Sequence, residues 1–451
     1  MTERRKTEQL TEEIRNKART GLDLLTAGGA DQARCRIAYS QTNEINVEDG
    51  KFSLYRTMFD TTAAFTAICG GRRGIVQSNQ VGDEHLRATA AECLAVAASA
   101  APDEAWQLAP GIGAHTVSTG ALEYEEERFY GRLVEFLDTV AERYPTVVIS
   151  ALSGIYTRER ACSVYSTGTQ VESLAGYYAV DITFNAVEDG VSSSFNYTGV
   201  KTDNLDTPFI EQGSFAANLS DITREVRTEA YKNTRVAAMV LTPTAFENFL
   251  YEIVGNFIGD TPLIDGSSIW KDKLGETVAD PRLTLCLAPR DERVVAGRYL
   301  TAEGYLVEDY ACIEDGVLRQ FVLSDYAARK TGRDRAPNTE YNFIVTPGNT
   351  PLADLIAGID HGILVNRFSG GSPSRNGDFS GVAKNSFLIE NGKITTALRE
   401  TMISGNLATM LKEVRGISAE TVADGNRVLP WIAVDGITLS GEQSVPSEGK
   451  L

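Results

Sequence analysis

The chain has 451 residues, of which 42% are hydrophobic and 23% charged, and this composition is typical of folded globular proteins rather than of disordered or fibrous ones. A chain of this length predicts two domains of roughly 200 residues each. The 61 acidic and 43 basic residues give a formal net charge of −18, which disfavours binding to nucleic acid and to anionic membranes.

No stretch of the sequence has the ~20 apolar residues that a membrane helix needs, and the N-terminal region lacks the apolar core of a signal peptide. We therefore expect a cytoplasmic protein with no membrane segment. The six cysteines are scattered without a CxxC pair, so they predict free thiols rather than a zinc knuckle.

The first 80 residues predict a helix followed by an antiparallel β-meander. Apolar side chains spaced by three and four residues over 7–27 form one face of a helix, which Gly28 ends. Strand-like runs follow over 35–80, and the Asp49-Gly50 pair is a typical hairpin turn.

Helical periodicity returns over 84–100 and over 120–143. The glycine-rich stretch 110–120 between them is expected to be a loop. It contains a Gly-x-Gly but no following Lys-Ser or Lys-Thr pair, so it does not predict a phosphate-binding loop. A strand-rich region follows over 146–199.

A polar stretch over 219–234 predicts a helical connector between two domains, and we place the boundary near residue 225. The predicted domains are an N-terminal α+β domain over 1–225 and a β-rich domain over 226–440. A disordered tail is expected over 441–451.

The second half is predicted to begin with a strand over 236–242 and a helix over 242–260, and to continue as β-structure. Its candidate turns are Asp315-Gly316, Asn376-Gly377, Asn391-Gly392 and Asp435-Gly436. The sequence thus predicts an α+β fold, in which a mixed domain of antiparallel strands and long helices precedes a β-rich domain.

A serine hydrolase is not predicted, because only three histidines are present and no GxSxG motif accompanies them. The helix over 242–260 is more informative, since it carries Tyr251, Glu252 and Asn256 among apolar residues. Tyr251 and Asn256 are five residues apart, which is about 140° around an ideal helix. They could therefore converge on one atom only if the helix bends or ends, and Gly255 is the expected place.

The run Tyr-Glu-Ile-Val-Gly-Asn over 251–256, taken with the block over 362–414, resembles the TldD/PmbA (TldE) family, the modulators of DNA gyrase. The shared motifs of that block are Gly-Asp-Phe-Ser-Gly (377–381), Glu-Asn-Gly-Lys (390–393) and Ile-Ser-Gly-Asn (403–406). The resemblance is looser before residue 200. In the TldD branch the helix carries His-Glu-x-x-x-His, whose histidines bind a catalytic zinc together with a later cysteine, and whose glutamate is the general base.

This sequence keeps only the glutamate of that motif. A phenol and a carboxamide are poor replacements for two imidazoles on zinc, and no cysteine follows Cys312. The resemblance therefore implies a PmbA/TldE-like chain with no metal, no cofactor and no catalytic residue of its own. Tyr251, Glu252 and Asn256 are then degenerate metal-site positions.

The resemblance further implies that the chain pairs with a zinc-bearing TldD-like subunit or with itself, in a dimer whose cavity receives unfolded peptides. Further cavity or turn residues are expected at Gly255, Asp378, Phe379, Ser380, Asn391 and Asn406. An alternative is a stand-alone hydrolase with a non-standard metal site, built from Glu252 and Asp or His residues elsewhere. The same three positions are also explained by ordinary helix residues that bond to local backbone.

Overall fold

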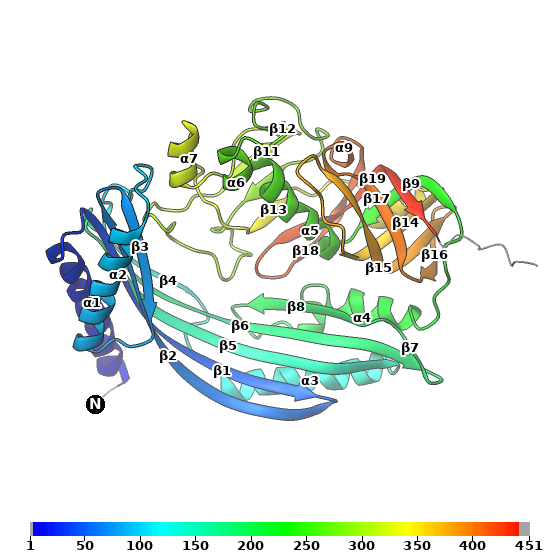
Figure 1. Ribbon diagram of the computed structural model, residues 1–451. Helices are drawn as coiled ribbons and strands as arrows, with labels where there is room; N and C mark the ends of the chain where they lie inside the picture. Colours follow the sequence, from blue (N-terminus) through cyan, green and yellow to red (C-terminus); the bar gives the residue numbers. More distant parts are fainter. Residues whose placement is uncertain (1–2, 442–451) are drawn as a thin grey trace, which may run out of the picture.

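The computed structural model describes residues 3–441, which form two β-sheets stacked with helices between and around them (Figure 1). The predicted α+β class is confirmed. The strands of the first sheet end at Thr202 and those of the second begin at Thr234, and we propose the domain limit at residue 225 between them. Apart from Gly441, the expected tail lies outside the described residues.

The N-terminal sheet has the order β3-β2-β1-β5-β6-β4, and β7 and β8 also pair with β6. Its strands are β1 (Gln32–Glu48), β2 (Lys51–Cys69), β3 (Arg72–Ser78), β4 (Gly113–Gly120), β5 (Val147–Tyr165), β6 (Thr169–Glu188), β7 (Val191–Ser192) and β8 (Asn196–Thr202). The predicted meander is confirmed, because β1, β2 and β3 pair antiparallel in that order.

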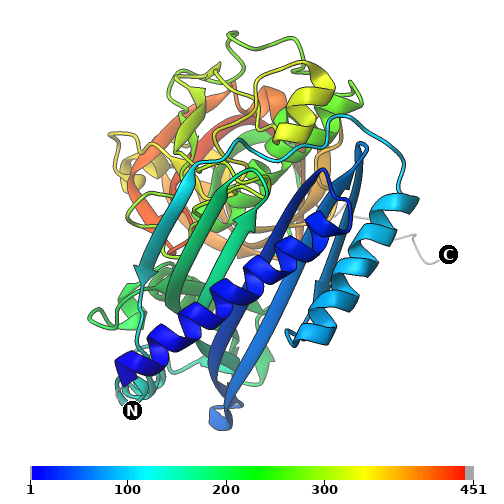
Figure 2. The ribbon, with the colours of Figure 1, turned by 90° about the vertical axis from the view of Figure 1, so that its left-hand side faces the viewer.

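Helices cover one face of this sheet. Figure 2 shows α1 (Glu3–Ala27) and α2 (Asp83–Ser99) side by side across one end of it, while α3 (Glu126–Arg143) lies beneath the other end in Figure 1. Strand alternation makes β6 amphipathic: Tyr178, Val180, Ile182 and Phe184 are buried in the cluster around α3. Asp181 and Thr183, between them, therefore face the C-terminal sheet.

Three sequence predictions for the first half need correction. The expected loop over 110–120 contains β4, which pairs in parallel with β6. The helix expected over 120–143 begins only at Glu126, because Gly120, with φ +72°, is still the last residue of β4 and residues 121–125 form neither helix nor strand. The connector helix expected over 219–234 is instead α4 (Phe215–Arg224), whose apolar face joins the α3 cluster.

The C-terminal sheet closes on itself, because β9 pairs with both β14 and β19 and completes a ring with β15 and β17. Its strands are β9 (Thr234–Leu241), β10 (Leu285–Leu287), β11 (Tyr310–Glu314), β12 (Val317–Leu318), β13 (Phe343–Val345), β14 (His361–Ser369), β15 (Asp378–Glu390), β16 (Lys393–Leu398), β17 (Thr401–Asn406), β18 (Val414–Ala423) and β19 (Val428–Ser440). The remaining elements are η1 (Phe209–Glu211), α5 (Pro243–Ile253), η2 (Val254–Ile258), α6 (Asp260–Ile264), α7 (Asp325–Thr331), α8 (Leu352–Ala357) and α9 (Leu407–Met410).

Most predicted Asp-Gly and Asn-Gly turns have the positive φ angles that such turns require, as at Asp315 (φ 48°) and Asn391 (φ 49°). Asp435-Gly436 is an exception, because it lies inside β19. The register of β19 against β9 shifts between Val434 and Ile437, so this pair forms a β-bulge and not a turn.

Candidate functional site

The helix α5 forms because its sequence supplies both a start signal and an apolar face. Thr242 caps the N-terminus, since its hydroxyl accepts a hydrogen bond from the Ala245 N–H at 3.3 Å, and Pro243 occupies the first helical turn. Phe246, Phe249, Leu250 and Ile253 are fully buried in the core of the C-terminal sheet. Each such side chain contributes about 1.5–3 kcal/mol by burial, so the helix is held rigidly.

The helix does not end at Gly255 but widens there into the π-turn η2. Its diagnostic bond runs from the Gly259 N–H to the Val254 carbonyl at 2.8 Å, five residues back. A π-turn brings residues five apart closer to one face than the 140° of an α-helix does, and π-turns are frequent at functional sites.

Asn256 of this turn lies beside Glu252 of the last turn of α5. The Asn256 Nδ2 donates to Glu252 Oε2 at 2.8 Å and to the Pro373 carbonyl at 3.0 Å, and the Asn256 side chain is buried. The Tyr251 ring packs edge-on against Tyr341 and Phe343, with centroids 5.4 Å away in both cases.

Two of the other expected site residues, Asp378 and Asn406, lie near the π-turn, next to the loop that carries Pro373. Asn406 Nδ2 donates to Asp378 Oδ1 at 2.8 Å and to the Asn376 carbonyl at 2.9 Å, and its Oδ1 caps α9. Gly377 (φ 93°) lies directly on the Phe257 ring, where an added Cβ would meet it at 3.2 Å. Gly255 joins the group, because Arg375 donates to its carbonyl at 3.4 Å.

The remaining expected residues lie elsewhere. Phe379 is buried in the core, with its ring 5.3 Å from that of Phe249, and Ser380 is an exposed strand residue bonded through its N–H to the Gly371 carbonyl. Asp378 begins β15, whereas Asn391 comes directly after its last residue. The Asn391 N–H donates to the Asp360 carbonyl. It therefore belongs to a structural turn far from the π-turn.

The donor set at the π-turn does not fit zinc. A catalytic zinc takes three nitrogen, sulfur or oxygen ligands, but the two histidine positions of the motif hold the Tyr251 phenol and the Asn256 amide, and that amide donates a hydrogen bond to Glu252 Oε2. Cys312 is buried in β11 and donates to the Leu285 carbonyl, and burial raises the pKa of its thiol far above the usual range. Across residues 3–441, no group of three or more His, Cys, Asp or Glu side chains is arranged to hold a metal ion.

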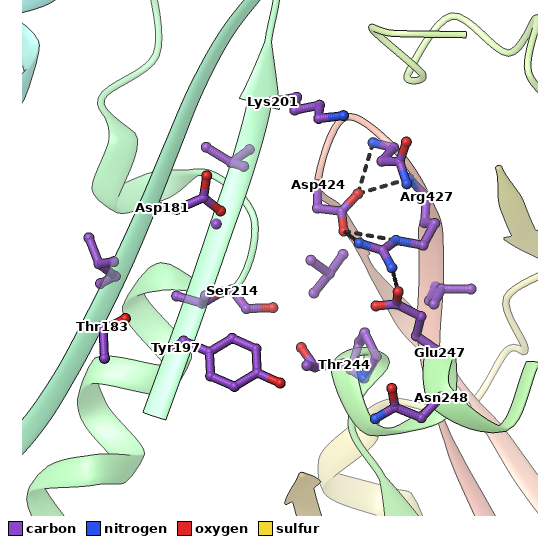
Figure 3. A pocket seen from close by; sticks show the side chains of 18 residues that line it. Asp181, Thr183, Tyr197, Lys201, Ser214, Thr244, Glu247, Asn248, Asp424 and Arg427 are labelled. Carbon is purple, nitrogen blue, oxygen red and sulfur yellow. Dashed lines mark hydrogen bonds and ion pairs between the residues drawn. The ribbon is translucent and has the colours of Figure 1, made fainter. Parts of the chain in front are cut away.

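A cavity of about 570 Å³ opens between the two sheets beside the first half of α5 (Figure 3). We call it the inter-sheet cavity. Its N-terminal wall is made by β6, β8 and Ser214, and its C-terminal wall by α5 and the hairpin that joins β18 to β19. Its charged lining residues are Asp181, Lys201, Glu247, Asp424 and Arg427.

Arg427 organises the C-terminal wall of the cavity. Its guanidinium bonds to Asp424 at 2.8 Å and also pairs with Glu247 of α5. Burial lowers the pKa of Arg427 to about 10 and raises the pKa of Asp424. The hairpin touches the other wall through the Lys201 N–H, which donates to the Asp424 carbonyl at 2.8 Å.

The cavity and the π-turn share one helix. Glu247 lies one helical turn before Tyr251, and burial raises the pKa of Tyr251, with a further contribution from Asp424. Sequence reasoning missed the cavity residues, because they come from segments far apart in the chain. The only local signal was the position of Glu247, four residues before Tyr251.

Two stretches of the chain match models of one protein family. Residues 234–441 match the PmbA/TldA metallopeptidase C-terminal domain, and residues 33–101 match PmbA/TldA metallopeptidase domain 1. The chain belongs to the PmbA/TldD family. The family's C-terminal domain thus contains α5, the π-turn and the whole C-terminal wall of the cavity.

Similar proteins of this family align with nearly the whole chain. The metalloprotease PmbA homologue of Haemophilus influenzae is 22% identical over 447 residues, which are 95% of this chain and 96% of that protein. The crystal structure of TldE from Thermococcus kodakarensis superposes with a TM-score of 0.80 at 19% identity, over 94% of this chain and 99% of that one. A Bacteroides thetaiotaomicron structure named as a modulator of DNA gyrase superposes with a TM-score of 0.80 at 22% identity. The superposition covers 95% of this chain and 99% of that one. These structural likenesses establish the fold.

Among residues 3–441, no helix is long and apolar enough to cross a membrane.

Proposed function

We propose that this chain is the PmbA/TldE-like, metal-free subunit of a TldD-type zinc metallopeptidase assembly that processes unfolded peptides. In this proposal a TldD-like partner holds the zinc and the general base. This chain completes the dimer, encloses the cavity and helps to hold the peptide. We further propose a cytoplasmic location and a dimer formed with that partner or with a second copy.

The observation that supports the proposal is the hydrogen bond between Asn256 and Glu252. In the TldD branch the glutamate at this position is the general base, which needs a free carboxylate close to a metal-bound water. Here the carboxylate accepts from a buried amide that the Pro373 carbonyl holds in place from the other side. The Asn256 amide therefore stands at the position of a histidine ligand and is hydrogen-bonded to Glu252, the residue at the position of the general base.

The test is cleavage of an unstructured peptide by this chain reconstituted with a TldD-like partner. Glu252→Gln should leave the cleavage rate within about twofold of the wild type, because the carbonyl oxygen of the new side chain still accepts from Asn256. The matched control is the equivalent glutamate change in the partner, which should lower the rate by the roughly 10²–10⁴-fold typical of a lost general base. If Glu252→Gln abolished cleavage while the pair still assembled, this helix would be an active site.

The stand-alone hydrolase is separated from this proposal by metal analysis. Purified chain that contains zinc near one equivalent, and loses peptidase activity on chelation, would establish the alternative. We expect less than about a tenth of an equivalent of zinc per chain, because the two imidazole ligands are missing from the π-turn.

A further inference from the structure

Asp181 is the one carboxylate of the inter-sheet cavity that no other described residue holds. Glu247 and Asp424 are both bonded to Arg427. In contrast, no hydrogen bond or ion pair joins the Asp181 side chain to any other residue in the described part of the chain. Figure 3 shows its carboxylate on the wall opposite Glu247, in the open part of the cavity.

The Asp181 side chain stays accessible from the cavity, but the surrounding walls withdraw part of its water. Asp181 is an exposed residue of β6, so a positive group can reach its carboxylate from the cavity without displacing a donor of the protein.

The charge of the cavity favours a cation. Three carboxylates line it, Asp181, Glu247 and Asp424, against the two cations Lys201 and Arg427, which leaves one negative charge in excess. Desolvation raises the pKa of both Asp181 and Asp424, and the Lys201 charge opposes that rise and helps to keep them ionised. The net charge of −18 on the whole chain adds to the attraction for a positive group.

Gly199 brings the Asp181 carboxylate onto the cavity face of β8. The two residues are directly opposite in the antiparallel pairing of β6 with β8, so their side chains would share one face. An added Cβ at Gly199 would meet Asp181 Oδ1 at 2.0 Å. The missing side chain therefore provides the space in which the carboxylate lies.

The outer edge of β8 has no strand partner among the described residues, although the loops at Gly213 and Gly425 pack against it near Gly199 and Lys201. All five residues of 197–201 line the cavity, and β8 is paired with β6 on one side only. On its outer side the Lys201 N–H is bonded to the Asp424 carbonyl, so the hairpin loop between β18 and β19 covers one end of this edge. The hydroxyls of Tyr197, Ser214 and Thr244 are directed into the space in Figure 3 and suit peptide amide groups.

We infer that the inter-sheet cavity is a subsite for one ammonium group of an extended peptide, which Asp181 binds while the peptide lies along β8. The inference rests on the proposed function, because it names the part of an unfolded peptide that this subunit would hold. The ammonium is either the free N-terminus or a lysine side chain. A volume of about 570 Å³ is within the usual range of ligand pockets and has room for a few residues.

The experiment is calorimetric titration of the full-length chain with an unstructured decapeptide of Gly, Ser and Ala that has one central lysine. Four forms of the probe are compared: free, N-acetylated, with the lysine replaced by glutamine, and with both changes. We expect the doubly changed peptide to bind about two- to fivefold more weakly than the free one, which is the range for an ion pair at an exposed carboxylate. The single change that reproduces this loss identifies the source of the ammonium.

Asp181→Asn keeps the shape and removes the charge, so it should weaken binding of the free peptide by the same factor and leave the doubly changed peptide unaffected. Gly199→Ala, which displaces the carboxylate, should have the same effect on the free peptide. The control is Asp138→Asn on the exposed face of α3, on the far side of the sheet, and should change nothing. Thermal unfolding verifies that each variant is folded.

Equal binding of all four probes, unchanged binding by Asp181→Asn, or no binding by the wild type would each overturn the inference. None of these results touches the proposed function, which the reconstituted cleavage assay tests separately with the free peptide as substrate at a saturating concentration. Cleavage of that peptide without a charge preference in binding would retain the subunit role and remove the subsite. Loss of cleavage while binding still depends on the ammonium charge would retain the subsite and remove the subunit role.

Discussion

Replacing Glu225 by glutamine should stabilise the protein above neutral pH. Glu225 follows α4 and is buried against the C-terminal sheet, where Asn385 Nδ2 donates to its Oε2 at 2.6 Å. Its Oε1 and the Oδ1 atoms of Asn366 and Asn385 are buried without a partner within the described residues. A glutamine would still accept from Asn385, and its amide nitrogen would offer a donor to these carbonyl oxygens.

The magnitude follows from proton linkage. Burial raises the pKa of Glu225 from 4.5 to about 8, with Asp221 adding to the rise and Arg367 and Arg224 opposing it. Because the folded state holds the Glu225 proton more tightly, the contribution of Glu225 to stability is fully present below about pH 4.5 and is lost as the pH rises to about 8. Each pH unit in that window costs up to about 1.4 kcal/mol, so the loss at about pH 8 is at most about 4–5 kcal/mol.

The assay is urea unfolding of wild type and Glu225→Gln at about pH 5 and at about pH 8. We expect the two proteins to have nearly equal free energies of unfolding at about pH 5. At about pH 8 the variant should be more stable by about 2–4 kcal/mol, which is below the upper limit of about 4–5 kcal/mol because the buried site relaxes around the charge. Burial also raises the pKa of Asp221, but this contribution is present in both proteins and cancels in the difference. Glu142→Gln, on the exposed face of α3, is the matched control and should shift neither value.

A glutamine variant that is less stable than the wild type at the higher pH would refute this reasoning. It would mean that the carboxylate is ionised in the folded protein and compensates the buried guanidinium of Arg367, which packs on the Phe195 ring at 4.6 Å. A gain that is equal at both pH values would refute it differently, by assigning the effect to the new hydrogen bonds alone.

Three other changes have definite expected outcomes. The double change Tyr251→His, Asn256→His should raise zinc affinity at least about tenfold by equilibrium dialysis without producing peptidase activity, because no cysteine ligand is present. Gly425→Ala should destabilise the fold by about 1–3 kcal/mol in urea unfolding, since Gly425 has φ +80° and its added Cβ would lie 1.9 Å from the Lys201 carbonyl oxygen. Thr242→Ala should cost about 1 kcal/mol in the same measurement through loss of the α5 cap, and Thr242→Ser should restore it.

The sequence alone determined the elements whose signals are local. The apolar spacing over 7–27 gives α1, the Asp49-Gly50 pair gives the β1–β2 turn, and Thr242 with Pro243 gives the start of α5. In each case the residues that form the element lie within a few positions of one another. The run over 251–256 and the motifs of the block over 362–414 also identified the family, because each of these motifs is a short local pattern.

The tertiary structure decided whatever depends on partners far along the chain. The β4 segment is mostly exposed and has no clear apolar alternation, so only its pairing with β6 makes it a strand. Asp435-Gly436 has the composition of a turn, but its pairing across β9 makes it a bulge inside β19. The π-turn after α5 places Val254, Phe257 and Ile258 in the core of the C-terminal sheet.

The inter-sheet cavity illustrates the same limit for function. Asp181 is set on the cavity face by the register of β6 with β8, and Arg427 by the hairpin between β18 and β19. Neither residue belongs to a local motif, since a single carboxylate or guanidinium is ordinary at a protein surface. Their altered pKa values and the space between them arise only when the two sheets stack, because desolvation and charge pairing are properties of three-dimensional packing and not of sequence order.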